Sequence, residues 1–513
     1  MPKNKTIKNI NNKLKNTLII KAFFLFIVFV IQIWFVIHII ATFQEIFTYF
    51  HFFSVILSLI ILLFIIADSD INPSYKISWI IPILVLPSFG WIFYLMFSNN
   101  LNKKNKVKKI SQLLKSNNHN LQEIQNKLAM RNAKYLIDYA DAEIFKNYDD
   151  TYFKVGEEYF QELLKQLEKA EKFIFMEYFI IEEGLLWNSI LDILKKKASE
   201  GVEVRLIYDY MGCMLTLPND YFKTLESYGI KVSVFNPVNI IFSIVINNRT
   251  HRKITVIDGK IAFTGGINLA DEYINHIEKF GHWKDSGIMI SGEGVWSFTV
   301  MFLDMWELIN KKNEDYFAYK HVFSKKIEKN HNGYIIPFSD TPFDKEQVCN
   351  TIYINIINNA TDYIYITTPY LIIDYEMTCA LKNASKKGVD VKIIMPHIPD
   401  KKAVFEASQS HYKTLIESGV KIFEYTPGFM HAKNFVSDDK YGIVGTINMD
   451  YRSLYLHFEC AVLLYECSVI DDIKKDFIST IEESQEVSLE ECTDISFTRH
   501  LYHAVLKIFA PLM

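Results

Sequence analysis

The chain of 513 residues has no excess of positive charge, few cysteines and no evident metal-binding cluster. Its 55 Lys and Arg residues are outnumbered by 59 Asp and Glu, which argues against a protein that binds nucleic acid through a global basic field. No acidic cluster has the spacing of a Mg²⁺ or Ca²⁺ site, so we predict chemistry without a metal or cofactor.

The cysteines are scattered, and none forms a CxxC pair, which argues against a zinc ribbon or a thioredoxin-like site. We expect them to be small buried side chains in a reducing compartment, although the sequence leaves one disulfide open. They are Cys213, Cys349, Cys379, Cys460, Cys467 and Cys492.

Large apolar residues are abundant, at 50% hydrophobic and 15% aromatic, which excludes a disordered chain. The 22% of charged residues exclude a transporter embedded in the membrane throughout, because so much charge needs a large water-exposed portion. The length predicts two to four structural units.

Three nearly uncharged runs, 22–42, 46–67 and 77–97, are each long enough to cross a bilayer as a helix. A cleaved signal peptide is disfavoured because the first run is too long and lacks a small-residue cleavage site. Lysines precede the first run and follow the third, so the positive-inside rule places both flanks in the cytoplasm. Three full crossings would separate the flanks, so we expect one run to turn back.

The third run is the one most easily interrupted, because it contains Pro82, Pro87 and Gly90. After it, residues 101–154 have apolar positions at helical spacing and predict a helical connector. The last residues, from Leu501, are apolar and predict a helix that lies on the bilayer or packs on the rest of the protein.

From residue 155 onward the pattern alternates between apolar strands and amphipathic helices, as in α/β proteins. The order recurs: the strand at 201–209 resembles that at 388–396, and 229–237 resembles 419–427. Two copies separated by about 190 residues indicate two homologous halves of one fold rather than a stack of short repeats.

We therefore divide the chain into five parts, with the polar stretch 311–347 as the join between the halves. The parts are a membrane anchor of two to three hydrophobic helices, 1–100, a helical connector, 101–154, a first half, 155–320, a second half, 321–490, and an apolar tail, 491–513.

Each half carries one copy of a motif in which Lys lies two residues after His, Asp seven after it and Asn seventeen after it. In a strand, residues two apart point to the same face, so each His and Lys project together. The Asp then begins a hairpin turn, and the return strand ends in a small-residue turn that presents the Asn. The residues are His251, Lys253, Asp258 and Asn268 in the first half and His431, Lys433, Asp438 and Asn448 in the second.

Two imidazoles, two ammonium groups and two amides around one point suit a phosphodiester. The lysines and asparagines would hold the non-bridging oxygens and stabilise a pentavalent transition state. One imidazole would attack phosphorus, and the other would protonate the leaving alcohol and deprotonate the incoming one. Asp258 and Asp438, which belong to the motif, are expected to brace the hairpins rather than touch substrate.

Each imidazole needs a partner on its other nitrogen to fix its tautomer. Glu459 is our candidate partner for His431 and Asp285 our candidate for His251, since these carboxylates occupy equivalent places in the two halves. Four further histidines have no duplicate and are interpreted as ordinary polar residues: His276, His282, His397 and His457.

The doubled motif resembles the HxKxxxxD signature of the phospholipase D superfamily, and both copies match without a substitution. Gly266 stands where many members carry Ser, which removes one hydroxyl contact. The wider context is similar to bacterial cardiolipin synthases: Asn72–Trp79 resembles their anchor, and Asn248–Lys253 and Tyr451–Leu454 resemble their motif flanks.

This resemblance implies an α/β fold of two pseudo-symmetric halves, each a mixed sheet flanked by helices, with an N-terminal helical anchor. It implies reversible phosphatidyl transfer between two phosphatidylglycerol molecules through a phosphohistidine, giving cardiolipin and glycerol. It further implies that His251 is the nucleophile and His431 the acid/base. The expected setting is the plasma membrane, with several crossings, a cytoplasmic catalytic part and anionic lipids as partners.

Three other functions remain open from the sequence. A lipid hydrolase would pass the same phosphatidyl group to water and release phosphatidic acid. A nuclease is disfavoured by the anchor and the lack of basic excess, and a scaffold with a relic site is disfavoured by two intact motifs. The apolar stretch 238–247, before the first motif, is expected either to line a lipid entry or to be a buried connector.

Overall fold

The computed structural model describes residues 34, 44–69, 71–97, 119–146, 149–236, 248–323 and 333–512. The chain packs as two units, residues 1–98 and 99–513. The predicted run 22–42 lies outside the described residues except for Trp34, and the stretch 238–247 lies outside them altogether.

In the first unit, the second predicted run forms one long helix, α2 (Gln44–Ala67). Its part Thr48–Ala67 has a mean hydropathy of 2.8 and is the one segment of the described residues long and apolar enough to cross a membrane. The structure therefore supports a single candidate span, and the several crossings expected from the sequence are not confirmed.

The third predicted run is broken, as its prolines indicated. It forms α3 (Pro73–Val85, 13 residues) and α4 (Gly90–Phe97, 8 residues), which at about 1.5 Å per residue are each too short to cross about 30 Å of hydrocarbon. The break packs back on α2, where the Ser58 hydroxyl donates to the Pro87 carbonyl at 2.8 Å. A carbonyl freed by a helix break thereby regains a donor, as apolar surroundings require.

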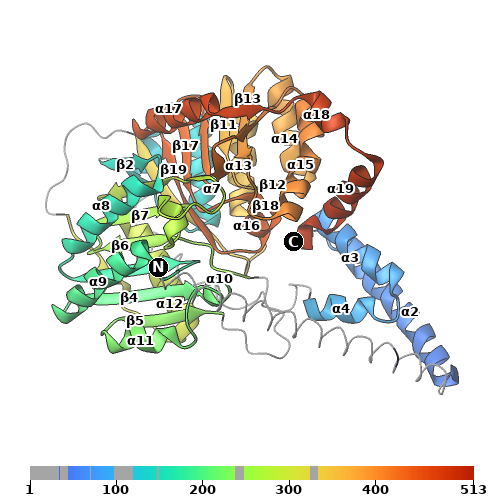
Figure 1. Ribbon diagram of the computed structural model, residues 1–513, viewed down its shortest axis with the longest axis horizontal. Helices are drawn as coiled ribbons and strands as arrows, with labels where there is room; N and C mark the ends of the chain where they lie inside the picture. Colours follow the sequence, from blue (N-terminus) through green and yellow to red (C-terminus); the bar gives the residue numbers. More distant parts are fainter. Residues whose placement is uncertain are drawn as a thin grey trace, which may run out of the picture. The chain divides into compact units, whose positions relative to one another are not determined.

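In the second unit, two sheets have the same strand order, which confirms that the two halves are copies of one fold (Figure 1). The shared order is β9-β7-β6-β3-β4-β5 in the first half and β19-β17-β16-β11-β13-β14 in the second. In each half the first strand, β3 or β11, runs parallel to β4 or β13 and antiparallel to β6 or β16. Both sheets are therefore mixed, as expected.

The strands and helices follow the predicted alternation closely. The strands of the first half are β3 (Phe173–Tyr178), β4 (Glu203–Asp209), β5 (Lys231–Phe235), β6 (Ile254–Ile257), β7 (Ile261–Gly265), β8 (His282–Lys284) and β9 (Gly287–Ser291). Those of the second are β11 (Tyr363–Thr367), β12 (Leu371–Ile372), β13 (Asp390–Pro396), β14 (Lys421–Tyr425), β15 (Gly428–Met430), β16 (Asn434–Ser437), β17 (Tyr441–Gly445), β18 (Met449–Asp450), β19 (Glu459–Tyr465) and β20 (Ser484–Glu486). The main helices are α8 (Gly156–Glu168), α9 (Leu185–Ser199), α10 (Tyr210–Cys213), α11 (Tyr221–Ser227), α12 (Val295–Asn310), α13 (Val348–Asn359), α14 (Tyr375–Lys386), α15 (Lys402–Ile416), α16 (Tyr451–Tyr455), α17 (Val469–Glu482), α18 (Leu489–Thr493) and α19 (Phe497–Phe509).

The segments before and between the halves add edge strands that the sequence did not reveal. The connector is helical over α6 (His119–Glu123) and α7 (Lys127–Tyr139), but it ends in β1 (Phe145–Lys146), in the second half's sheet, and β2 (Asp150–Phe153), in the first's. The predicted join contains β10 (Tyr334–Asp340), which pairs with β19. The sequence did not predict this strand because it contains Pro337, which has no N–H to donate to a neighbouring strand. Strand β1 pairs only with residues 334 and 335 of β10. At Pro337, β10 is therefore an edge strand, where a missing N–H is tolerated.

A shared hydrophobic core joins the halves. It includes Phe175 and Ile207 of the first sheet, Ile394 and Val462 of the second, and apolar residues of α12 and α17. Two further large clusters belong one to each half, and a small one joins α15 and α19. Because the halves share a core, side chains at their common edge are held in fixed relative positions.

Candidate active site

Each motif lies on an extended segment that leads into the first strand of a hairpin, β6–β7 or β16–β17. The hairpin turns have positive φ at both central residues, Asp258 and Gly259 (+55° and +66°) and Asp438 and Asp439 (+55° each). This is the geometry of a type I′ turn, which matches the twist of the flanking strands. The hairpins predicted from the spacing are confirmed.

The motif aspartates brace these hairpins. The Asp258 carboxylate accepts the backbone N–H groups of residues 171, 172 and 173, at 2.7 to 2.9 Å, where β3 begins. Asp438 accepts those of residues 361, 362 and 363 in the same way. Both carboxylates are therefore occupied away from the imidazoles, as expected of residues that brace the hairpins.

The two imidazoles take their carboxylate partners from opposite halves, which corrects the pairing expected from the sequence. His251 Nδ1 lies 3.0 Å and 3.1 Å from the two Glu459 oxygens. His431 Nδ1 lies 2.6 Å from Asp285 Oδ2. The residues were identified correctly, but Glu459 serves His251 and Asp285 serves His431.

Backbone pairing between the halves explains this exchange. The His251 N–H donates to the carbonyl of Phe458, the residue before Glu459, at 2.9 Å. The His431 N–H donates to the carbonyl of Lys284, the residue before Asp285, at 2.7 Å. Strand β8 runs parallel to β15 just before His431, and Thr250 forms the matching parallel bridge with Phe458. The halves therefore exchange carboxylates by a repeated geometry.

The lysines are buried beside the imidazoles. Lys253 Nζ donates to the His251 carbonyl at 2.7 Å, and Lys433 Nζ donates to the His431 carbonyl. Lys433 Nζ also lies 2.9 Å from His431 Nδ1, but that nitrogen cannot both accept from an ammonium group and donate to Asp285. The short contact with the carboxylate indicates that His431 Nδ1 carries a proton and donates it in a hydrogen bond to Asp285. The other ring nitrogen, Nε2, is therefore the one that can react.

Burial and nearby cations favour neutral imidazoles. Burial, followed by the charge of Lys433, lowers the pKa of His431 to about 4, although Asp285 opposes the shift. Burial and the charges of Lys253, Lys433 and His431 hold the pKa of His251 well below its usual range. His251 is therefore close enough to His431 and to both lysines to be affected by their charges, as one shared site requires.

The lysines and Glu459 are also perturbed by burial, which lowers the pKa of Lys253 to about 7 and that of Lys433 to about 8. It raises the pKa of Glu459 to about 7. A bound phosphodiester would add negative charge and favour the cationic lysines. The site can thus accept an anion with little reorganisation.

The position after each return strand differs between the halves. The Thr446 hydroxyl donates to Glu459. At Gly266, a Cβ would lie 2.1 Å from Asp285 Oδ1, so a glycine leaves space for the carboxylate itself. The residue that departs from the common family pattern is therefore required by the position of Asp285.

The two motif asparagines also differ. Asn268 accepts the Ile180 N–H at 3.0 Å and donates to the Tyr273 hydroxyl at 2.7 Å, so both ends of its amide are in use. Asn448 has a buried Oδ1 without a hydrogen bond. Direct binding of phosphate by either amide stays a prediction.

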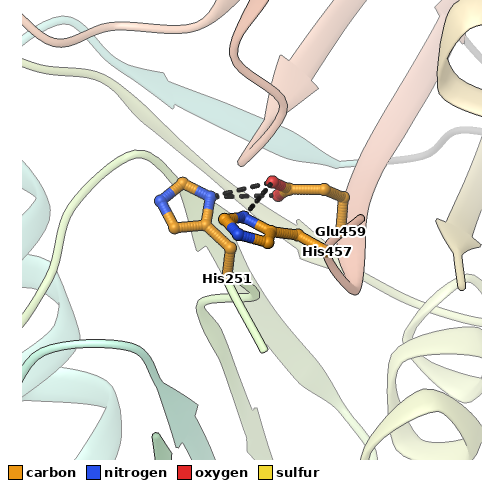
Figure 2. Close-up of side chains that lie close together, drawn as sticks. All are labelled: His251, His457 and Glu459. Atoms are coloured by element: carbon orange, nitrogen blue, oxygen red, sulfur yellow. Dashed lines mark hydrogen bonds and ion pairs between the residues drawn. The ribbon is translucent and has the colours of Figure 1, made fainter. Parts of the chain in front are cut away.

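Sequence reasoning missed several residues around the imidazoles. The rings of Tyr273 and Trp283 lie 5.4 Å and 5.2 Å from the His431 ring, and the Phe179 ring lies 5.3 Å from that of His251. His457, interpreted as an ordinary polar residue, lies beside His251 and Glu459 (Figure 2). Trp283 and His457 occupy equivalent places, two residues before the carboxylates, but their residue types differ, so the repeat did not mark them.

The repeated sheet order, the doubled motif and the exchanged carboxylates define a two-half, phospholipase D-like enzyme. A family model for the PLD-like domain of cardiolipin synthase matches residues 163–286 and 353–481, and one for the phospholipase D-nuclease N-terminal region matches 56–99. The crystal structure of phosphatidylserine synthase from Haemophilus influenzae Rd KW20 shares the fold, with a TM-score of 0.56, 16% identity and coverage of 74% of this chain and 98% of that one.

Sequence relatives are more specific. Cardiolipin synthase 2 of Bacillus anthracis is 34% identical over 460 residues, which cover 86% of this chain and 87% of the relative. Cardiolipin synthase of Alkalihalophilus pseudofirmus is 32% identical, with coverage of 89% and 92%. An uncharacterised protein of Streptococcus mutans is 48% identical, with coverage of 87% and 98%. The chain belongs to the cardiolipin synthase family.

Proposed function

We propose that this protein is a cardiolipin synthase that transfers a phosphatidyl group from one phosphatidylglycerol molecule to another. The observation that carries the proposal is the pair of buried imidazole–carboxylate contacts, His251 with Glu459 and His431 with Asp285, made across the interface between the halves. The family's named members, which are cardiolipin synthases, support cardiolipin as the product.

The reaction follows from which nitrogens are free. With each Nδ1 directed at a carboxylate, Nε2 of His251 attacks the phosphorus of the donor lipid, and the bond from phosphorus to the glycerol oxygen breaks. The negative charge of the bound phosphodiester favours a doubly protonated His431, which gives its Nε2 proton to the departing glycerol and becomes neutral. The neutral His431 then takes the proton of the second lipid's hydroxyl, whose oxygen attacks phosphorus and releases His251.

The lysines stabilise the charge that develops at phosphorus. Lys253 and Lys433 are fully buried, and each is anchored by the carbonyl of its own histidine. Fixed cations in a site that excludes water stabilise a pentavalent transition state without rearranging during the reaction. Asn448, with its free buried amide oxygen, is proposed to orient the nearby groups.

Product analysis tests this function directly. We expect the purified full-length protein, given phosphatidylglycerol in mixed micelles, to yield cardiolipin and free glycerol in equal amounts by mass spectrometry. Phosphatidic acid as the only lipid product would show a hydrolase instead. His251→Ala and His431→Ala should each abolish turnover while the protein remains folded, and near-normal turnover by either variant would contradict a shared site.

We further propose that the protein resides in the plasma membrane with its catalytic part on the cytoplasmic side and that α19 rests on the bilayer surface. The polar side of α19 faces the protein: Arg499 and His503 contact Glu406 at 2.9 Å and 2.7 Å. Its exposed side is apolar, with Phe497 81%, Leu501 57% and Val505 43% exposed. A helix with its apolar side outward needs an apolar partner, and the lipid substrate supplies one.

Substitution on this face separates membrane contact from chemistry. Leu501→Ser combined with Val505→Ser should lower activity on phosphatidylglycerol vesicles several-fold and leave activity in mixed micelles unchanged. Val322→Ser, at a side chain that is 81% exposed but outside α19, is the matched control. Equal activity of the double variant and the control on vesicles would contradict a role for α19 at the bilayer.

A further inference from the structure

Two extended segments, 249–251 and 457–459, lie side by side next to the catalytic pair. The Phe458 N–H donates to the Arg249 carbonyl and the His251 N–H to the Phe458 carbonyl, both at 2.9 Å. Alternate side chains of an extended segment share a face. Arg249 lies two residues before His251, and His457 lies two residues before Glu459. The side chains of Arg249 and His457 therefore lie on the same face as those of His251 and Glu459.

The intervening residues confirm this arrangement because they point the other way. The Thr250 hydroxyl donates to Glu177, a buried residue of β3. The Phe458 ring packs against Phe235 and Phe343, with ring centroids 5.6 Å and 5.0 Å away. The face with the imidazoles is thus distinct from the apolar face.

Two side chains on the catalytic face are buried with polar atoms that make no hydrogen bond. His457 is 9% exposed, and neither of its ring nitrogens has a hydrogen-bond partner; Glu459 Oε1 lies 3.9 Å from Nδ1, beyond hydrogen-bond distance. Arg249 is 3% exposed, and its Nη2 is without a partner. Buried polar groups are normally satisfied, so donors of this kind indicate an absent ligand.

The acid nearest to Arg249 is largely committed elsewhere. Asp209 Oδ1 lies 3.6 Å from Arg249 Nη1, but the same carboxylate accepts the backbone N–H groups of Met211, Gly212 and Thr250 at 2.9 to 3.2 Å. Arg249 therefore retains donor capacity that Asp209 does not use.

The charges around His457 favour an anion over a metal ion. His251, His457 and Glu459 are spaced closely enough to hold a metal ion. However, the His457 backbone N–H donates to the Arg452 carbonyl at 2.9 Å, which places Arg452 beside it. Burial is the main cause that holds the pKa of His457 well below its usual range, and the charges of His251, Arg452, Lys253 and Arg249 lower it further, so an added dication would meet repulsion. An anion would gain from the same cations.

We propose that Arg249, His457 and Arg452 form a second anion subsite that holds the phosphate of the acceptor phosphatidylglycerol while its hydroxyl attacks the phosphohistidine. The assignment deepens the proposed synthase function and rests on it. An extended chain rises about 3.3 Å per residue, so Arg249 lies about 6.6 Å along the segment from His251. That separation is suited to two phosphates joined by the three carbons of one glycerol.

The test compares two acceptors that differ in this phosphate. The full-length protein receives phosphatidylglycerol and an excess of ¹³C-labelled glycerol, and mass spectrometry follows cardiolipin and labelled phosphatidylglycerol together. Both products arise from one phosphohistidine, but free glycerol carries no phosphate for the subsite. The measured quantity is the ratio of cardiolipin to labelled phosphatidylglycerol.

We expect His457→Ala and Arg452→Gln each to lower this ratio about tenfold or more, the effect of losing one hydrogen bond to a charged group. Thr446→Val is the matched control, because it also removes a contact from the Glu459 region but lies outside the subsite, and it should slow both reactions equally. Equal slowing by His457→Ala and Arg452→Gln would overturn the subsite.

Two other outcomes are distinguishable. If the unaltered protein makes phosphatidic acid and no cardiolipin, the proposed function itself fails. If His457→Ala leaves the ratio unchanged but removes inhibition by micromolar Zn²⁺, His457 is part of a metal site and the anion subsite is wrong.

Discussion

Replacing Asp285 with Asn should prevent His431 from acting as a base, although Asp285 belongs to the first half and His431 to the second. Asp285 Oδ1 accepts the Ser286 N–H at 2.8 Å, so the oxygen of the new amide would stay there and its nitrogen would face His431. An amide nitrogen donates, which forces His431 Nδ1 to accept and moves the ring proton to Nε2. In that tautomer His431 cannot take a proton from the incoming hydroxyl.

The expected loss can be bounded. A hydrogen bond to a charged group contributes about 1.5–3 kcal/mol, which alone slows the reaction about 10- to 150-fold. The wrong tautomer raises the loss in kcat to as much as about 10⁴-fold, the scale observed when the orienting carboxylate of a catalytic histidine becomes an amide. The 2.6 Å contact in the native protein places Asp285→Asn towards the upper part of this range.

A phosphatidyl ester of p-nitrophenol provides the assay, because nitrophenolate leaves without a general acid. If His251 is the nucleophile, Asp285→Asn and His431→Ala should retain a first-turnover burst of nitrophenol and lose cardiolipin synthesis. Glu459→Gln and His251→Ala should lose both.

The decisive comparison is between variants rather than with the native rate. Exchanged pairing requires Asp285→Asn to resemble His431→Ala in its burst, whichever histidine is the nucleophile. If Asp285→Asn instead resembled His251→Ala, the pairing described above would be refuted.

Three further results are expected. Gly266→Ala should reduce kcat about 100-fold or more while the protein stays folded, because its Cβ would displace the Asp285 carboxylate, and measured kcat near the native value would contradict this. As pH rises through about 7 to 8, kcat/KM should fall, because Lys253 and Lys433 lose their charge in the free enzyme. The corresponding fall in kcat should occur at higher pH, because bound phosphodiester stabilises the cationic lysines. If kcat and kcat/KM fell at the same pH, this reasoning would be contradicted. Asp258→Asn should lower the free energy of unfolding by about 2 kcal/mol, because the carboxylate accepts three backbone N–H groups, and chemical denaturation of the solubilised protein measures it; an unchanged midpoint would contradict the bracing role.

The sequence predicted most of the candidate site because the repeat marked it twice. The spacing from His251 to Asn268 recurs from His431 to Asn448, and the structure confirms the hairpins and the common strand order of the halves. Asp285 and Glu459 were found because they occupy equivalent places. Periodicity specifies which residues are equivalent but not which half supplies a partner, so the exchange of carboxylates needed three-dimensional information.

Other features lacked any local signal. Strand β10 contains Pro337, and the edge position that tolerates it depends on pairing with two residues near the start of the second unit. The counterpart of His457 in the first half is Trp283, so the repeat did not mark it as a histidine, and its position beside His251 results from backbone pairing between segments about 200 residues apart in sequence.

The exchange of carboxylates links the evolutionary histories of the two halves. A substitution at Asp285 is felt by the imidazole of the opposite copy, so selection on either motif acts on residues encoded far from it. After duplication, neither copy could diverge freely or be replaced by an unrelated module without inactivating the other. Each half is therefore incomplete on its own, because its imidazole contacts a carboxylate that the other half supplies.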